Sequence, residues 1–198
     1  MPCRISKHRQ CFQAPAIVIA LGSNLAGRFG MPNATIQRAL DELNARGVQI
    51  ASASRLYRTA AHANTPQPDF VNAIATVYTP MSAGSLLQIL KRIEAQAGRR
   101  AAKKADPTVL NWAPRTLDLD LISYKGLVCN WKMRAPLKDG CVILPHPRAH
   151  QRAFVLRPLA EVAPFWHHPV FGLTAAQLLK RPGVEETGAI LGAGEDLG

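Results

Sequence analysis

Two acidic residues separated by one leucine are the chemically most suggestive feature of this chain. Asp118 and Asp120 lie in the run Pro114-Arg115-Thr116-Leu117-Asp118-Leu119-Asp120-Leu121-Ile122. Side chains alternate between the two faces of a strand, so both carboxylates would project from one face while the leucines enter the core. Their Cα atoms would stand about 7 Å apart, because a strand rises about 3.4 Å per residue. A divalent cation held by both acids would remove their mutual repulsion.

Magnesium is the cation that this pair predicts. Mg²⁺ is usually held by one or two carboxylates together with phosphate oxygens and water. Arg115, Lys103 and Lys104 lie close in the sequence, and phosphoryl transfer requires such positive charge around the transferring group. The alternative is a solvated strand face that happens to carry two acids.

A second group of polar residues lies between Leu144 and Phe154. His146, Arg148, His150 and Arg152 fall within seven residues, and Pro145 and Pro147 frame the start of this segment. We expect a rigid cationic loop that clamps a nucleotide, with His146 and Arg152 reaching phosphates. Arginine suits this role because its planar fork binds two oxygens at once. The alternative is an exposed basic turn.

Glu94 and Arg99 form a third candidate pair near the end of a predicted helix. Glu94 follows the apolar residue Ile93, which places it near the edge of the apolar stripe. Taken alone, Glu94 is a surface acid, and Arg99 is a cation favoured by the helix dipole.

One apparent nucleotide motif is excluded. The run from Gly22 to Phe29 (GSNLAGRF) approaches the P-loop pattern, but Arg28 replaces the lysine and Phe29 has no metal-binding hydroxyl. The glycines still permit a tight bend beside a ligand.

The elements that must position these residues follow from apolar spacing and from start and stop signals. Pro32 can open the first helix and Gly47 end it, while Ser82 is a candidate N-cap of the second, with Gly98 just beyond its end. The predicted elements are strands at Ala16–Leu21, Val48–Tyr57, Phe70–Tyr78 and Thr116–Tyr124, helices at Pro32–Gly47, Ser82–Ala97 and Ala153–Val162, and a short segment at Cys141–Leu144.

This order predicts an α+β fold with a ferredoxin-like βαββαβ core, in which helices pack on one face of an antiparallel sheet. A C-terminal extension follows the core. We expect residues 1–14 to form a disordered basic arm, 15–182 a single domain, and 183–198 a flexible tail. The arm is also compatible with a transit peptide, since it carries Arg4, Lys7 and Arg9 and no acidic residue.

The charge, cysteine content and hydropathy of the chain indicate its environment and the kinds of partner that it can bind. The chain has 198 residues, a net charge of +11 and a pI of about 10.1, so its surface attracts polyanions, either nucleic acid or nucleotide phosphates. The four cysteines show no metal-ligand spacing and predict free thiols in a reducing compartment. No apolar stretch approaches the ~20 residues of a membrane span. We also expect a cytoplasmic monomer that acts on small molecules and binds neither membrane nor nucleic acid.

Several motifs together resemble those of the 6-hydroxymethyl-7,8-dihydropterin pyrophosphokinases of folate biosynthesis. The resemblance covers roughly Ile17 to Pro164. The matching blocks, in order, are Leu21-Gly22-Ser23-Asn24-Leu25, Ser54-x-x-Tyr57-Arg58-Thr59, Pro68-Asp69-Phe70-x-Asn72-Ala73, Ile93-Glu94-x-x-x-Gly98-Arg99, Pro114 to Asp120, and Leu144-Pro145-His146-Pro147-Arg148.

This resemblance implies that the chain transfers pyrophosphate from ATP to the pterin hydroxymethyl oxygen and releases AMP. Asp118 and Asp120 would hold two Mg²⁺ ions, and Arg99 and Arg115 would stabilise charge on the transferring group. The implied ATP-binding residues are Lys91, Glu94, Lys103, Lys104, His146 and Arg152.

The resemblance also implies a pterin site. The ring would stack between Phe70 and Phe154, because a flat heteroaromatic ring needs aromatic faces and polar groups for its edge. The remaining implied contacts are Thr59, Ala60, His62, Asn72 and Trp112.

Three stretches depart from the family pattern. Ala60-Ala61 replaces a common Pro-Pro pair, Arg100–Asn111 is long and expected to form a mobile lid, and Lys125–Gly140 is expanded without a role that we can assign.

Two other classes of function fit parts of the sequence. An RNA-binding domain of the RRM type shares the element order and the charge, but the chain lacks the aromatic run that this module needs on its sheet. A catalytically inactive relative kept as a scaffold is the other alternative, and no key position suggests it.

Overall fold

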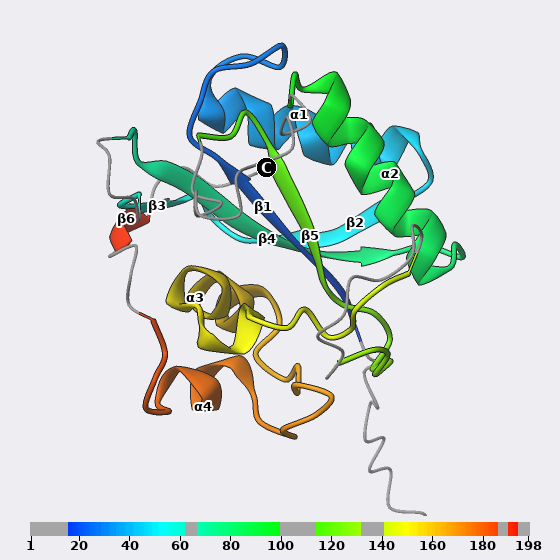
Figure 1. The fold of residues 1–198 in the computed structure, drawn as a ribbon, viewed down its shortest axis with the longest axis vertical. Coiled ribbons are helices and arrows are strands. Elements are labelled where there is room, and N and C mark those ends of the chain that lie inside the picture. Colours follow the sequence, from blue (N-terminus) through cyan, green and yellow to red (C-terminus); the bar gives the residue numbers. More distant parts are fainter. Residues whose placement is uncertain (1–15, 62–66, 100–113, 132–140, 186–189, 194–198) are drawn as a thin grey trace, which may run out of the picture.

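The computed structural model describes residues 16–61, 67–99, 114–131, 141–185 and 190–193. Figure 1 shows a twisted sheet with helices α1 and α2 on one face and helices α3 and α4 on the other. The elements are β1 (Ile17–Ser23), α1 (Pro32–Ala45), β2 (Gln49–Ala53), β3 (Tyr57–Thr59), β4 (Phe70–Tyr78), α2 (Ala83–Gln96), β5 (Asp118–Ser123), the 3-10 turn η1 (Ala149–Gln151), α3 (Ala153–Val162), α4 (Ala175–Leu179) and β6 (Ile190–Ala193).

The sheet confirms the predicted α+β class. Its strands lie in the order β5-β1-β4-β3-β6, with β2 pairing the other end of β4, and every pair is antiparallel. From β1 to β5 the chain follows the expected β-α-β-β-α-β order, with the second strand in two pieces.

The prediction of one continuous strand at Val48–Tyr57 was wrong in its detail. Residues 54–56 separate β2 from β3, and side chains take part in the hydrogen bonding there beside a backbone bond from Ser54 to Ile74. The Ser54 hydroxyl accepts the Ile74 amide at 3.0 Å, and Glu161 accepts the Arg55 amide at 3.0 Å. The expected strand at Thr116–Tyr124 is shorter as well, and Leu144 forms only an isolated bridge with Cys129.

Local signals at the helix ends acted as predicted. Pro32 opens α1, and Gly47 follows it with a φ of 77°. The Ser82 hydroxyl caps α2 by accepting the Ser85 amide, and Gly98 has a φ of 97° just beyond the helix. Such positive φ values strain any residue with a Cβ, which explains the glycines.

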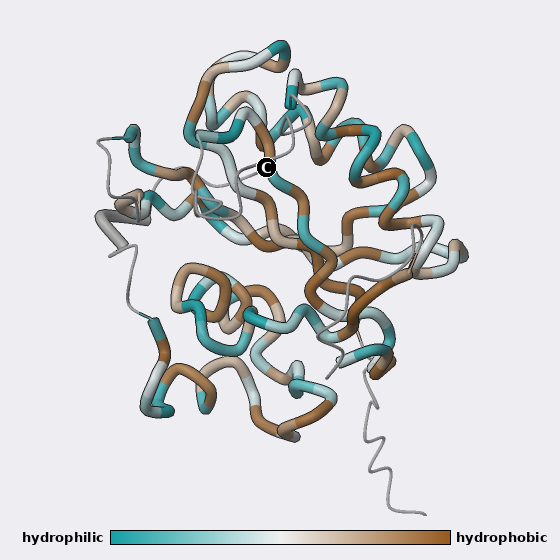
Figure 2. Tube along the Cα trace, viewed as in Figure 1, coloured by the Kyte–Doolittle hydropathy of each residue, from teal (hydrophilic) through white to brown (hydrophobic). Residues whose placement is uncertain are grey.

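The expectation that helices cover one face of the sheet needs correction, because the protein has two cores. The first lies between the sheet and helices α1 and α2. The second lies beneath the opposite face, where Val18, Ile74 and Ile122 pack against α3 and α4. These three residues form an apolar patch on that face, which requires cover from the C-terminal helices. Figure 2 shows apolar segments running along the central strands between the two helical layers.

The C-terminal part contains one strand that the sequence did not predict. Strand β6 pairs with β3 within the segment that was expected to be a flexible tail. Cys129 and Cys141 are the cysteines in the described ranges, and both are free thiols. No helix among the described residues has the length and apolar character needed to cross a bilayer.

Candidate active site

Strand β5 carries both acids on the face of the sheet that α3 and α4 partly cover. Leu119 and Leu121 enter the first core, whereas Ile122 joins the second, so the predicted alternation along the strand is confirmed. Asp118 and Asp120 share the face of Ile122 and stay partly exposed, at 25% and 33% of their side chains. They therefore face a site rather than a core.

The neighbouring strand β1 offers small residues beside these acids. Asp118 pairs across the sheet with Gly22, and Gly22 pairs on its other side with Asn72 of β4. A Cβ on Gly22 would lie 3.0 Å from the Asn72 Oδ1 atom. Gly22 therefore keeps the space between Asp118 and Asn72 free of a β1 side chain.

Two arginines hold Asp118. Its Oδ1 atom accepts hydrogen bonds from the guanidinium groups of Arg99 at 2.8 Å and Arg115 at 2.7 Å. Burial opposes ionisation of this carboxyl group, but Arg115 and Arg99 outweigh burial and hold the pKa of Asp118 below its ordinary value. The group is thus a carboxylate at neutral pH, and neither of these two hydrogen bonds uses its Oδ2 atom.

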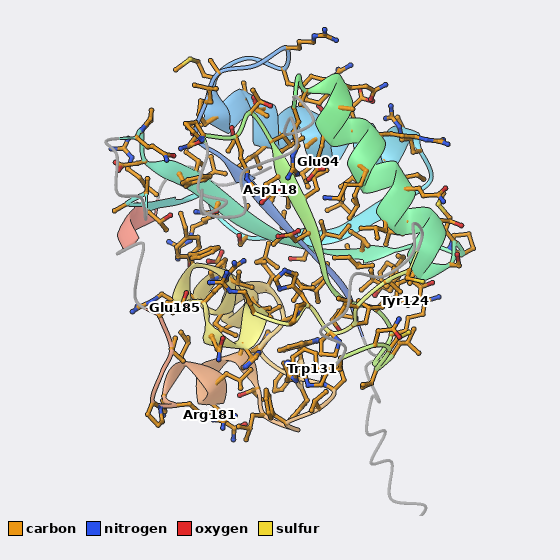
Figure 3. The ribbon with its side chains drawn as sticks, viewed as in Figure 1. Glu94, Asp118, Tyr124, Trp131, Arg181 and Glu185 are labelled. Atoms are coloured by element: carbon orange, nitrogen blue, oxygen red, sulfur yellow. The ribbon has the colours of Figure 1, made fainter. Side chains whose placement is uncertain are left out.

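Glu94 is a buried part of the same network, so its interpretation as a surface acid was wrong. The residue is 2% exposed on α2 and lies beside Asp118 (Figure 3). Its Oε1 atom accepts the Leu119 amide at 2.8 Å and a hydrogen bond from Arg99, and Lys91 lies 3.0 Å away. Burial raises the pKa of Glu94, while Lys91, the Leu119 amide and Arg99 act in the opposite direction. Glu94 therefore fixes Arg99 and the start of β5.

The histidine- and arginine-rich segment after β5 reaches the second acid. His146 Nε2 lies 3.9 Å from Asp120 Oδ2, and the His146 amide donates to the Ile122 carbonyl at 2.8 Å. Burial lowers the pKa of His146, only partly offset by Asp120, so the ring is neutral at neutral pH. His146 therefore lies near the acids, and its role in a nucleotide clamp stays a prediction.

Arg152, which opens α3, completes this side of the site. Burial and the nearby Arg148 lower the pKa of Arg152, whereas Asp120 and Asp118 act to raise it. Its Nε atom is buried without a hydrogen-bond partner among the described residues, and its guanidinium lies 5.5 Å from the Phe154 ring centre. Arg152 thus stands between the acids and the aromatic side of the site.

The residues expected to bind a pterin lie on β3, β4 and α3. Asn72 donates to the Thr59 hydroxyl at 2.8 Å, and Thr59 pairs with Phe70 across the two strands. Phe70 and Phe154 are both half-buried, as is Ala60. The structure brings Thr59, Phe70 and Asn72 together, and stacking between Phe70 and Phe154 stays a prediction.

Four predicted site residues lie outside the described part of the chain: His62, Lys103, Lys104 and Trp112. The expected lid at Arg100–Asn111 lies outside it as well. Conversely, sequence reasoning gave no role to Glu161, whose carboxylate accepts the Tyr57 hydroxyl at 2.5 Å and ties α3 to β3. Tyr57 stands in a motif, but no local signal pairs it with a residue that lies 104 positions away.

In this α+β fold, neighbouring carboxylates are set among arginines and a neutral histidine, an arrangement that suits the class of phosphate-transferring enzymes. The family model of 7,8-dihydro-6-hydroxymethylpterin-pyrophosphokinase matches residues 18–164. The chain belongs to this family, which confirms the resemblance found in the motifs.

Relatives with this family's name are similar over most of their length. A 2-amino-4-hydroxy-6-hydroxymethyldihydropteridine pyrophosphokinase of Synechocystis is 37% identical over 174 residues, which cover 87% of this chain and 77% of the relative. An enzyme of the same name from Methylorubrum extorquens is 33% identical, with 74% of this chain and 81% of the relative covered.

Solved structures support the fold. HPPK-DHPS of Plasmodium falciparum, crystallised with STZ-DHP, superposes with a TM-score of 0.57 at 14% sequence identity. The match covers 84% of this chain but only 41% of that protein, so the chain spans less than half of its length.

Proposed function

We propose that this chain transfers pyrophosphate from ATP to the hydroxymethyl group of 6-hydroxymethyl-7,8-dihydropterin, giving the pterin diphosphate and AMP in folate biosynthesis. In this reaction the hydroxymethyl oxygen bonds to the β-phosphorus of ATP, the bond from that phosphorus to the oxygen bridging to the α-phosphate breaks, and the hydroxyl proton is lost. The observation that carries the proposal is the pair Asp118 and Asp120 on one face of β5, with Arg99 and Arg115 bound to Asp118, in a chain of the pyrophosphokinase family.

The carboxylates fit Mg²⁺. Asp118 keeps one oxygen outside its two arginine contacts, and Asp120 keeps a third of its side chain exposed. Two carboxylates are too few to enclose a cation, and within the described ranges no cluster of three metal-ligating side chains occurs. Mg²⁺ suits such an open site because phosphate oxygens and water complete its coordination. When bound, two Mg²⁺ ions held by Asp118 and Asp120 would neutralise charge on the phosphates.

Arg99 and Arg115 are proposed to stabilise charge on the transferring pyrophosphate. Because Glu94 and Asp118 already fix the Arg99 guanidinium, little reorganisation is needed when a phosphate arrives. The neutral ring of His146 and the guanidinium of Arg152 would offer further donors for ATP. Lys91 would add positive charge at the same end of α2, and the proposed contacts of Lys103 and Lys104 fall in the lid segment.

The pterin is proposed to lie on the β4 side of the acids. Asn72 offers an amide beside Gly22, and Thr59 and the backbone of Ala60 lie at the adjoining end of β3. Phe70 and Phe154 would supply the aromatic faces, and His62 and Trp112 would close the ring's edges.

The family match favours this reaction over an RNA-binding domain and over an inactive scaffold. The proposal includes a monomer that acts in the cytoplasm on small molecules alone, with no nucleic acid or membrane partner. Light scattering of the purified chain with and without RNA tests the monomer and the absence of nucleic acid together.

An assay of AMP release tests the reaction itself. With ATP, hydroxymethyl dihydropterin and Mg²⁺ we expect stoichiometric AMP and pterin diphosphate, and with excess chelator we expect neither. ADP as the product would show transfer of one phosphate instead. Absence of any nucleotide turnover with both substrates would reject the proposal in favour of the scaffold.

A further inference from the structure

Asn24, the residue directly after β1, is buried at a junction of three segments. It is 2% exposed and stands in the Gly22-Ser23-Asn24 motif, to which the reaction gives no role. Both polar atoms of its side chain are used, each toward a different segment of the candidate site.

On one side Asn24 holds the segment that leads into β5. Its side-chain Oδ1 atom accepts a hydrogen bond from the Arg115 backbone amide at 2.7 Å. The backbone amide of Asn24 donates to the Arg115 carbonyl at 3.1 Å. The neighbouring Ser23 hydroxyl donates to the Thr116 carbonyl at 2.6 Å. The main chain of Arg115 is therefore fixed at both its polar groups, three residues before Asp118, which its guanidinium binds.

On the other side Asn24 holds the segment that leads into β4. Its Nδ2 group donates to the Pro68 carbonyl at 3.1 Å and lies 3.4 Å from the Gln67 Oε1 atom. Pro68 stands two residues before Phe70 and four before Asn72, the proposed pterin contacts. One amide group thus bridges the segment with the phosphate-binding residues and the segment with the pterin-binding residues.

We propose that Asn24 is a positioning residue that sets the spacing between the pterin side and the phosphate side of the site. The inference rests on the proposed function, because it assigns Arg115 to the pyrophosphate and Phe70 and Asn72 to the pterin. Transfer requires the acceptor oxygen and the phosphorus to approach in one geometry, and a misplacement of about 1 Å can lower the rate about 100-fold.

The chemistry of the amide makes the two links separable. Asparagine offers one acceptor oxygen and one donor nitrogen, whereas an aspartate offers acceptors alone and an alanine neither. Asn24→Asp keeps an acceptor for the Arg115 amide but places a carboxylate oxygen against the Pro68 carbonyl. Asn24→Ala removes both side-chain links and leaves the backbone hydrogen bond to the Arg115 carbonyl in place.

Kinetics and calorimetry of these two variants test the proposal. We expect Asn24→Ala to lower kcat about 10- to 100-fold with both substrates saturating. We expect Asn24→Asp to bind ATP within about threefold of the wild type and to bind the pterin at least about tenfold more weakly. Equal changes in both affinities for Asn24→Asp would overturn the two-sided link.

A matched control separates positioning from folding. Asn44 also accepts a backbone amide, that of Ile50 at 3.0 Å, but it is an exposed residue in the last turn of α1. Asn44→Ala should lower Tm without changing kcat. If Asn24→Ala lowers Tm and likewise keeps wild-type kcat, its role is structural only and the inference fails.

Hydrogen exchange without ligands tests the links independently of activity. Peptides covering 67–72 and 114–119 should both exchange faster in Asn24→Ala, but only 67–72 should do so in Asn24→Asp. Unchanged exchange in both variants would overturn the inference. A wild-type protein without turnover would reject the proposed function, and this exchange pattern would still show whether the links exist.

Discussion

The two faces of the sheet use one set of strands in different ways. The face toward α1 and α2 is covered by a continuous apolar core that includes Ile19, Leu119 and Leu121. The opposite face is apolar only around Val18, Ile74 and Ile122, where α3 and α4 cover it, and farther along it carries the acids and Asn72.

Strand β5 contributes to stability through one face and to the candidate site through the other. In β5 every second residue enters the first core, so the backbone that carries Asp118 and Asp120 is anchored by Leu119 and Leu121. Charged groups are expensive to bury, and the two acids of β5 lie on the face where arginines, a histidine and solvent surround them. Substitutions on the two faces of β5 should accordingly affect different properties.

The largest difference between an effect on activity and an effect on stability is expected for Asp120→Ala. We expect kcat/KM to fall on the order of 100- to 1000-fold, because a charge that stabilises the reacting phosphates is lost. The free energy of unfolding should change by less than about 1 kcal/mol, since Asp120 is partly exposed. Turnover and urea unfolding measure the two effects. The control is Asp41→Ala, which removes an exposed acid of α1. Near-normal turnover in Asp120→Ala would contradict the metal role.

The adjacent residue on the other face should show the reverse. Leu119→Ala should lower the free energy of unfolding by about 2–5 kcal/mol, because it leaves a cavity in the first core. Below the unfolding transition, kcat should stay within a few-fold of the wild type. A loss of kcat as large as that of Asp120→Ala in a fully folded sample would show that the faces are not separable.

Within the site face, Phe154→Ala should separate the two substrates. Removal of one stacking ring should weaken pterin binding by about 1–3 kcal/mol, the scale of burying one aromatic side chain. ATP affinity should be largely kept. Calorimetry with each ligand measures this, and an equal loss of both affinities would count against the stacking role.

A pH-dependent effect on stability should arise where aromatic side chains extend the cover of the second face. His168 is 1% exposed beside Trp166, and burial, with His150 and Arg181 nearby, lowers its pKa to about 4. The unfolded chain therefore binds a proton between pH 6.5 and about 4 that the folded protein does not, so stability falls as pH falls through this window.

His168→Asn should flatten this pH dependence, since asparagine does not titrate. Unfolding midpoints measured from pH 7 to pH 4 should decline less steeply in the variant than in the wild type. Parallel declines would show that His168 is not the group that titrates.

Much of the fold could be predicted because its signals are local. The alternation of leucine and aspartate along β5, the Pro32 and Ser82 helix starts, and the helix at Ala153–Val162 all depend on spacing within one segment. The acids and the arginines of the candidate site were found in the same way, from residue types that phosphate chemistry requires.

The remainder depends on contacts between distant segments. From its position in the helix alone, Glu94 is predicted to be a surface acid. The packing of α2 against β5 buries it beside the Leu119 amide, which donates a hydrogen bond to it. The break between β2 and β3 likewise depends on Glu161, more than 100 positions later, and β6 becomes a strand only because β3 presents an open edge.

The family, the α+β class and the residue types proposed to bind phosphate could be predicted from the sequence, since motifs, periodicity and caps are properties of short segments. The tertiary structure alone decided that helices cover both faces, that His146 lies near Asp120, and that Asn24 links two sides of the site. The physical reason is that burial and hydrogen-bond partners are set by which segments the sheet order brings side by side, and the spacing of residues in a segment does not contain that order.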